Sequence, residues 1–156
     1  MRWVRPEHLH LTLAFLGEID EAQASAATSA IAEPLDQAPF DIAFQGLGAF
    51  PPRGAPRVLW IAVAAGEAQV SALAREVADR LGQARVPFED RPFSPHLTIA
   101  RWKTSRPSDR QRVLHAARSG IVAALRVDHA TLYSSQLSAD GPRYTELARA
   151  NLTTRG

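Results

Sequence analysis

Apolar and polar residues alternate most regularly near the start of the chain. From position 9, every second residue is a large apolar one, and a period of two is typical of a β-strand with one buried face. The pattern predicts a strand over residues 8–16. Its core-facing side chains are expected to be Leu9, Leu11, Leu13 and Phe15.

Helix signals follow a different spacing. Asp20 is suited to cap an alanine-rich helix that Pro34 ends, and Ser108 with Gln111 forms a capping box for a later helix. Between them, apolar residues recur every three or four positions after Glu67, which indicates one buried helical face. The predicted helices span residues 20–33, 67–82 and 108–120.

Apolar runs bounded by turn residues predict further strands. The Pro/Gly-rich loop at residues 51–56 separates two of these runs, and the dipeptide Asp140-Gly141 is a turn signal between two more. The predicted strands span residues 40–48, 57–65, 93–102, 125–137 and 143–152.

One short phrase occurs twice in these predicted strands. The pattern H-x-T-[LIV] begins at His10 and again at His96, 86 residues apart. Two chance matches are expected in roughly one sequence of this size in several hundred. Because side chains alternate along a strand, His10 and Thr12 should share one face, and His96 and Thr98 should do the same.

The two phrases also reveal an internal repeat. The order of motif strand, helix, strand and strand is predicted once from residue 8 and again from residue 93. Strands and helices in this mixture predict an α+β fold. The second copy is preceded by a strand and helix within residues 57–82, whereas the first copy begins almost at its motif. By this symmetry we expect an initial strand and helix to be missing from the first half.

Two imidazoles and two hydroxyls are a suitable set for cleaving a phosphodiester. If the motif strands are neighbours, one imidazole takes a proton from the nucleophile while the other gives a proton to the leaving oxygen. The hydroxyls of Thr12 and Thr98 then donate to the non-bridging oxygens. This chemistry requires neither a metal, nor another cofactor, nor a covalent intermediate.

Other interpretations of the histidines remain open. A single histidine on a strand is most often a structural or surface residue. His8 and His10 also form a His-x-His pair, a spacing that suits two ligands of one metal ion. Against a metal site, the chain has no Cys and no obvious third ligand, and the second copy has Ser94 where the first has His8.

The composition of the chain limits the kinds of site and function that it can have. The chain has 156 residues and no Cys, so it has neither a disulfide framework nor a thiol nucleophile. A net charge of +2 is too small to indicate nucleic-acid binding, although the local cluster of Arg101, Lys103 and Arg106 suits either a phosphate site or an ordinary solvated surface. No segment has the character of a signal peptide or a membrane span, so we expect a soluble cytoplasmic protein that does not bind membranes.

The sequence resembles the 2H phosphoesterases, and among them the LigT-like RNA 2′,3′-cyclic phosphodiesterases, often labelled 2′-5′ RNA ligases. The resemblance covers nearly the whole chain and depends on residues 2–4, 6–18, 56–60, 92–101, 132–137 and 141–144. It implies a single domain over residues 1–156, built of two intertwined, pseudo-symmetric lobes of antiparallel-rich sheet with outer helices and a central cleft. Similar proteins usually begin with a strand and helix, which we expect to be missing from this sequence.

The resemblance also implies roles for the motif residues. His10 would be the proton donor to the leaving 3′ oxygen, and His96 the acceptor that activates water. Thr12 and Thr98 would hold the phosphate oxygens. The substrates would be RNA 3′ ends or nucleotides with a 2′,3′-cyclic phosphate, opened to a 2′-phosphomonoester. Ligation would be the same attack by a 5′-hydroxyl. A complete first lobe would predict a monomer.

Further candidates surround these four residues. Strict alternation places Trp102 on the face of His96, where its ring would stack on a base or simply pack within the lobe. Alternation places Arg101 on the opposite face, so that it reaches phosphate only if a β-bulge turns it. Tyr133 and Tyr144 are expected to lie in the core or to line the cleft.

Two alternative functions stay beside the leading one. The first is a non-catalytic module that binds RNA ends or nucleotides, and the second is a phosphodiesterase acting on a small cyclic phosphate. Two proton-transfer groups are not needed for binding alone, so their presence favours an enzyme.

Overall fold

The computed structural model describes residues 1–117 and 119–154, and the chain divides into two compact units. Each unit combines three separate stretches of sequence. Unit 1 contains Met1–Thr12, Asp41–Val70 and Ser94–Leu125, so it holds both H-x-T motifs. Unit 2 contains Leu13–Phe40, Ser71–Phe93 and the residues from Arg126 onward.

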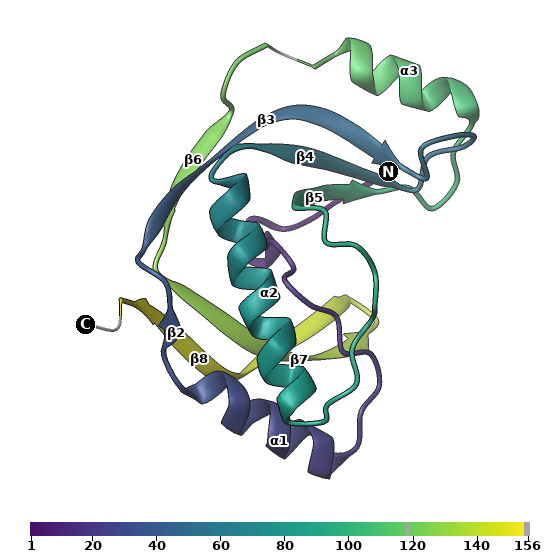
Figure 1. The fold of residues 1–156 in the computed structure, drawn as a ribbon. Helices are drawn as coiled ribbons and strands as arrows, with labels where there is room; N and C mark the ends of the chain where they lie inside the picture. The colour runs from purple at the N-terminus through teal and green to yellow at the C-terminus, as the bar shows by residue number, and fades with distance from the viewer. Residues whose placement is uncertain (118, 155–156) are drawn as a thin grey trace. The chain divides into compact units, whose positions relative to one another are not determined.

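Unit 1 is built on a five-stranded sheet with the order β1-β5-β4-β3-β6 (Figure 1). Strands β1 and β5, β5 and β4, and β4 and β3 pair antiparallel. One face of the sheet is core, because Ala49, Leu59 and Ala100 lie in register across three strands and are at most 8% exposed. The strands are β1 (Arg2–Trp3), β3 (Phe40–Phe50), β4 (Val58–Ala65), β5 (His96–Arg101) and β6 (Ala123–Val127).

Helix α3 (Pro107–His115) holds the loop between β3 and β4. The guanidinium of Arg110 donates to the carbonyl oxygens of Ala49 (3.2 Å) and Gly54 (3.0 Å), and also to that of Pro51. Charge-assisted bonds to three carbonyls give this Pro/Gly-rich loop a defined position beside the helix.

Unit 2 combines helices with a three-stranded sheet of order β2-β8-β7 (Figure 1). Strands β7 and β8 form an antiparallel hairpin that ends in the pair Ser138 and Gly141, and α1 packs against β8. The elements are α1 (Glu21–Ala32), β2 (Leu35–Asp36), α2 (Glu67–Gln83, whose first turn belongs to unit 1), β7 (His129–Ser138) and β8 (Gly141–Thr153).

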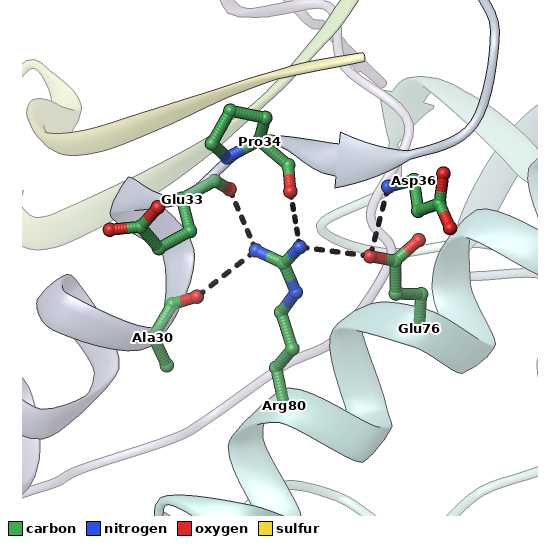
Figure 2. Close-up of polar contacts among 6 residues, drawn as sticks. All are labelled: Ala30, Glu33, Pro34, Asp36, Glu76 and Arg80. Carbon is green, nitrogen blue, oxygen red and sulfur yellow. Dashed lines mark hydrogen bonds and ion pairs between the residues drawn. The ribbon is translucent and has the colours of Figure 1, made fainter. Parts of the chain in front are cut away.

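Arg80 on α2 fixes the end of α1 (Figure 2). Its guanidinium donates to three carbonyl oxygens at and just beyond the end of that helix, those of Ala30 (3.3 Å), Glu33 (2.7 Å) and Pro34. Glu76, one turn earlier on α2, accepts from Arg80 at 2.9 Å and from the backbone N–H of Asp36 at 3.1 Å. The last carbonyls of a helix have no partner within it, and Arg80 supplies one.

The α+β class and most predicted elements are confirmed. Asp20 caps α1 as expected, accepting the N–H of Gln23 at 2.7 Å, and the helix predicted over residues 67–82 is α2. The predicted capping box of Ser108 and Gln111 is wrong. Arg106 is the N-cap of α3, and its N–H donates to Asp109 at 2.8 Å, because Pro107 begins the helix one residue earlier. The strand predicted over residues 125–137 is interrupted at Asp128.

The prediction of a strand over residues 8–16 is wrong. Residues 6–8 form a short 3-10 helix, η1, and the described residues from 9 to 20 join no sheet. Alternation shows that a segment can have a buried face, but a strand also needs a neighbour for its backbone. The edge of β5 is already paired with β1, and the predicted core residues Leu9 and Phe15 are 40% and 59% exposed.

No helix in the described part of the chain is long and apolar enough to cross a membrane.

Candidate active site

The second motif lies at the start of β5, on a face shared with aromatic residues of unit 1. His96 is opposite Ala62 and Thr98 is opposite Trp60 on β4, and directly opposed residues point to the same side of a sheet. The His96 ring meets Phe50 edge to face, with ring centroids 5.3 Å apart, and the Trp60 ring lies at 6.0 Å. These contacts pack the imidazole against two aromatic rings.

The position of Trp60 depends on a glycine. A Cβ at Gly48 would lie 2.1 Å from the Trp60 ring, which therefore occupies the space above the glycine backbone. The indole Nε1 is buried and makes no hydrogen bond among the described residues, so this ring contributes through packing. Sequence patterns did not identify Phe50 or Trp60, because nothing local connects them to His96.

Both motif histidines are held in the same way. Nδ1 of His96 donates to the carbonyl oxygen of Ser94 at 2.8 Å, and Nδ1 of His10 donates to the carbonyl oxygen of His8 at 2.7 Å. A carbonyl can only accept, so the hydrogen of a neutral ring stays on Nδ1. The two imidazoles therefore take the same tautomer when they are neutral.

The first motif reaches unit 1 by a route that the sequence did not predict. The N–H of Val4 donates to the carbonyl oxygen of Ile99 at 2.9 Å, extending the pairing of β1 with β5. Helix η1 then turns the chain, and its last residue, His8, supplies the carbonyl that holds the His10 ring. His10 and Thr12 are exposed and belong to the same compact unit as His96 and Thr98.

A β-bulge decides which way Arg101 points. Leu59 on β4 is opposite Ala100, but the next residue, Trp60, is opposite Thr98, so Ile99 is an extra residue in β5. After the bulge Arg101 is opposite Val58, which lies two residues from Trp60 and so on the same face. The sequence analysis required a β-bulge for Arg101 to reach the motif face, and the structure has this bulge. The exposed Arg101 side chain therefore lies on the face of His96 and Thr98.

The same bulge removes the alternation argument on which the expectation for Trp102 depended. Alternation is broken at Ile99, and β5 ends at Arg101, so counting by twos from His96 does not place the Trp102 ring. Its backbone N–H donates to the carbonyl oxygen of Arg57 at 2.9 Å. Strict alternation therefore does not support placing Trp102 on the His96 face, and that placement stays a prediction.

Two further expectations can be compared with the structure. Tyr133 and Tyr144 lie in unit 2 and form an edge-to-face pair with centroids 6.0 Å apart. They are 49% and 37% exposed, so neither lies in the core, and the alternative that they line the cleft stays a prediction. Within residues 1–117 and 119–154, no group of three or more His, Cys, Asp or Glu side chains is placed to hold a metal ion.

The sequence profile of the 2′-5′ RNA ligase superfamily matches residues 2–138. The chain belongs to this superfamily. It is 39% identical over 147 residues to the RNA 2′,3′-cyclic phosphodiesterase of Aquifex aeolicus, an alignment that covers 92% of this chain and 78% of the relative. The protein of the same description from Archaeoglobus fulgidus is 37% identical over 145 residues, with 92% and 80% coverage.

Solved structures give the same family. TT0787 of Thermus thermophilus superposes with a TM-score of 0.76 at 31% identity and covers 99% of this chain and 84% of its own. Escherichia coli LigT in its apo form gives a TM-score of 0.72 at 29% identity, with 98% and 81% coverage. LigT complexed with 3′-AMP gives 0.71 at 26% identity, with the same coverage.

Proposed function

We propose that this protein hydrolyses the terminal 2′,3′-cyclic phosphate of RNA to a 2′-phosphomonoester. The observation that carries the proposal is the matched pair of imidazoles in unit 1, each anchored through Nδ1 to a backbone carbonyl. The names of the relatives from Aquifex aeolicus and Archaeoglobus fulgidus support the same reaction. An RNA end is an intracellular substrate, so we propose the cytoplasm as the site of action and a monomer as the active form.

The reaction divides between the two histidines. His96 accepts a proton at Nε2 from water, whose oxygen then attacks phosphorus. As the bond between phosphorus and the 3′ oxygen breaks, His10 gives the proton on Nε2 to that oxygen. The product keeps phosphate on the 2′ oxygen. His96, which began neutral, ends protonated, and His10, which began protonated, ends neutral. In ligation, a 5′-hydroxyl takes the place of water.

The hydroxyls of Thr12 and Thr98 donate to the non-bridging oxygens, where negative charge grows as water adds. The guanidinium of Arg101, on the face of His96 because of the bulge at Ile99, adds a bidentate donor for phosphate. No step in this scheme needs a metal ion.

A direct assay tests the proposal. Purified protein is incubated with a nucleoside 2′,3′-cyclic phosphate and with a short RNA that ends in one, and the products are separated by chromatography against 2′- and 3′-phosphate standards. We expect the 2′-phosphate from the wild type. His10→Ala and His96→Ala should each lower the rate by at least about a hundredfold, and the double variant should be little worse than either.

Three results would contradict the proposal. Unchanged turnover in His10→Ala would remove that residue from the mechanism. Tight binding of the cyclic phosphate without hydrolysis by the wild type would identify a binding module instead. Hydrolysis of a small cyclic phosphate but not of an RNA end would show that the substrate is the small molecule and not RNA.

A further inference from the structure

Arg110 connects helix α3 with the aromatic residues around His96. Its guanidinium donates to the carbonyl oxygen of Ala49 at 3.2 Å and to that of Pro51. Ala49 and Pro51 lie on either side of Phe50, whose ring meets the His96 ring edge to face. One side chain, 61 and 59 residues further along the sequence, therefore holds the backbone on both sides of Phe50.

Two more hydrogen bonds hold this segment. Arg110 donates to the carbonyl oxygen of Gly54 at 3.0 Å, and the backbone N–H of Arg57 donates to the carbonyl oxygen of Phe50 itself at 2.7 Å. A guanidinium is planar and its donors have fixed directions, so it binds several carbonyls at once only when they keep a defined arrangement. Arg110 thus ties the end of β3 to the loop that follows it.

The backbone of Phe50 decides where the ring lies. Phe50 is opposite Val58, and Val58 is opposite Arg101, so Phe50 points to the face that Arg101 shares with His96. Its ring centroid is 5.3 Å from that of His96 and 5.2 Å from that of Trp60. Because Phe50 is the last residue of β3, the backbone just beyond it is held by the loop contacts and not by strand pairing.

Arg110 is poorly suited to act on a substrate directly. Its side chain is half-buried, and its guanidinium already donates to three carbonyl oxygens. Hydrogen bonds from a charged donor are stronger than neutral ones, so giving them up for a phosphate would cost stability. An influence of Arg110 on the reaction therefore has to pass through the residues that it holds.

We propose that Arg110 is a positioning residue for His96 and acts through Phe50. By fixing the backbone on both sides of Phe50, it keeps the Phe50 ring against the imidazole, and the imidazole keeps Nε2 directed at the attacking water. The inference rests on the proposed function for the role of His96 as the proton acceptor. It adds to the site a residue of α3, a helix that contains none of the motif residues.

Steady-state kinetics with a nucleoside 2′,3′-cyclic phosphate test the proposal. Arg110→Met and Phe50→Leu should each lower kcat at least about fivefold and change KM by less than about twofold, because a displaced proton acceptor slows the chemical step more than binding. If Arg110 acts through Phe50, the double variant should be no slower than the slower single variant. A kcat in the double variant lowered by the product of the two single effects would overturn the proposal.

Two arginines provide matched controls. Arg80 also donates to three carbonyl oxygens, but in unit 2, so Arg80→Met should lower the melting temperature and leave kcat within about twofold of the wild type. Arg112 is on α3 with a side chain that is 80% exposed, and Arg112→Met should change neither quantity. Equal falls of kcat in Arg110→Met and Arg80→Met would show that general loss of stability is the cause, and would overturn the proposal.

Arg110→Lys separates the geometry of the guanidinium from its charge. Lysine keeps the positive charge but replaces the planar fork with a single point of donation, so it should restore only part of kcat. It also serves as the test variant if circular dichroism shows that Arg110→Met does not fold. Full restoration by lysine, together with a raised KM in Arg110→Met, would show that the charge acts on the substrate and would overturn the proposal.

Proton NMR gives a measurement that does not depend on turnover. The ring current of Phe50 shifts the signals of the His96 ring protons, which the spectrum of His96→Ala assigns. In Arg110→Met these signals should move toward their positions in Phe50→Leu, whereas in Arg80→Met they should stay in place. Unchanged His96 signals in Arg110→Met would overturn the inference even if the wild type hydrolyses the substrate. Signals that move as expected in a protein without hydrolysis would support the packing of Phe50 by Arg110 and overturn the proposed function.

Discussion

Phe50 meets the ring of His96 edge to face, with the ring centroids 5.3 Å apart. Phe50 is the last residue of β3, and Trp60 packs beside it at a centroid distance of 5.2 Å. A histidine that transfers protons must keep one orientation through the reaction. In the proposed reaction, packing against Phe50 and Trp60 would contribute that restraint for His96.

Gly48→Ala should disturb His96 without touching it. The new Cβ would lie 2.1 Å from the Trp60 ring and displace it. We expect a loss of stability on the order of 2 kcal/mol and a fall in kcat larger than any change in KM. Thermal unfolding and steady-state kinetics measure the two effects.

Gly82→Ala is the control for this prediction. Gly82 lies inside α2 with open space where its Cβ would be, so alanine should raise stability by about 0.5 to 1 kcal/mol and leave kcat unchanged. Full activity in Gly48→Ala would show that Trp60 does not orient His96.

Nitrogen NMR should show both motif histidines as the tautomer protonated at Nδ1 in the neutral form. The reason is that each Nδ1 faces a carbonyl oxygen, at 2.7 Å for His10 and 2.8 Å for His96. The spectra of His10→Ala and His96→Ala assign the signals. A neutral ring protonated at Nε2 in either residue would contradict the hydrogen bonds described above.

Activity should depend on pH as a bell-shaped curve and survive complete chelation of metals. One imidazole must be neutral and the other protonated, so the rate falls when both are protonated or both are neutral. Thr12→Val and Thr98→Val should keep the shape of the curve and lower its height by about ten- to a thousandfold. Loss of activity with EDTA, restored by zinc and abolished in His8→Ala, would instead favour the His8-x-His10 metal site.

Arg80→Met should destabilise unit 2. The substitution leaves carbonyl oxygens at the end of α1 without their donor, in a place where the Arg80 side chain is only 15% exposed. We expect a loss of about 2 kcal/mol in urea unfolding. Arg75→Met, beside Glu76 in sequence but exposed on α2, should change stability by less than about 0.5 kcal/mol. Equal effects of the two substitutions would show that the carbonyl bonds contribute little.

Acid should weaken one contact at the start of β7. Nδ1 of His129 donates to Asp128 at 2.6 Å, and this hydrogen bond holds the pKa of the Asp128 carboxyl below its ordinary value. A carboxyl with a lowered pKa stabilises the fold above its ordinary pKa, and this contribution is lost as the pH falls through the folded value. Because Asp128 is exposed, Asp128→Asn should reduce the acid sensitivity of unfolding only slightly.

Local signals predicted the parts of the fold that depend on local chemistry. The cap at Asp20 and the apolar spacing after Glu67 lie within single helices, and both helices form as expected. The strand predicted over residues 8–16 failed because its formation depends on a free sheet edge far away in sequence. The bulge at Ile99 is also set by pairing with β4, so only the structure could decide the direction of Arg101.

The candidate site also combines residues that a local motif reveals with residues that only the tertiary structure brings together. The repeated motif identified His10, Thr12, His96 and Thr98 from the sequence alone. The packing of Phe50 and Trp60 on His96 was not visible, since these residues come from other strands and nothing local connects them to His96. The pairing of Arg2 with Arg101 likewise joins positions almost a hundred residues apart.

The atoms that orient the two motif histidines belong to the main chain. A carbonyl oxygen is present whichever side chain the residue carries, and the two anchoring residues, His8 and Ser94, are indeed chemically unlike. Substitutions at these positions that preserve the backbone path should therefore be tolerated. The path of the backbone sets the orientation of each imidazole, and no particular side-chain type is needed for it. A search of sequences for a shared orienting side chain would therefore find none.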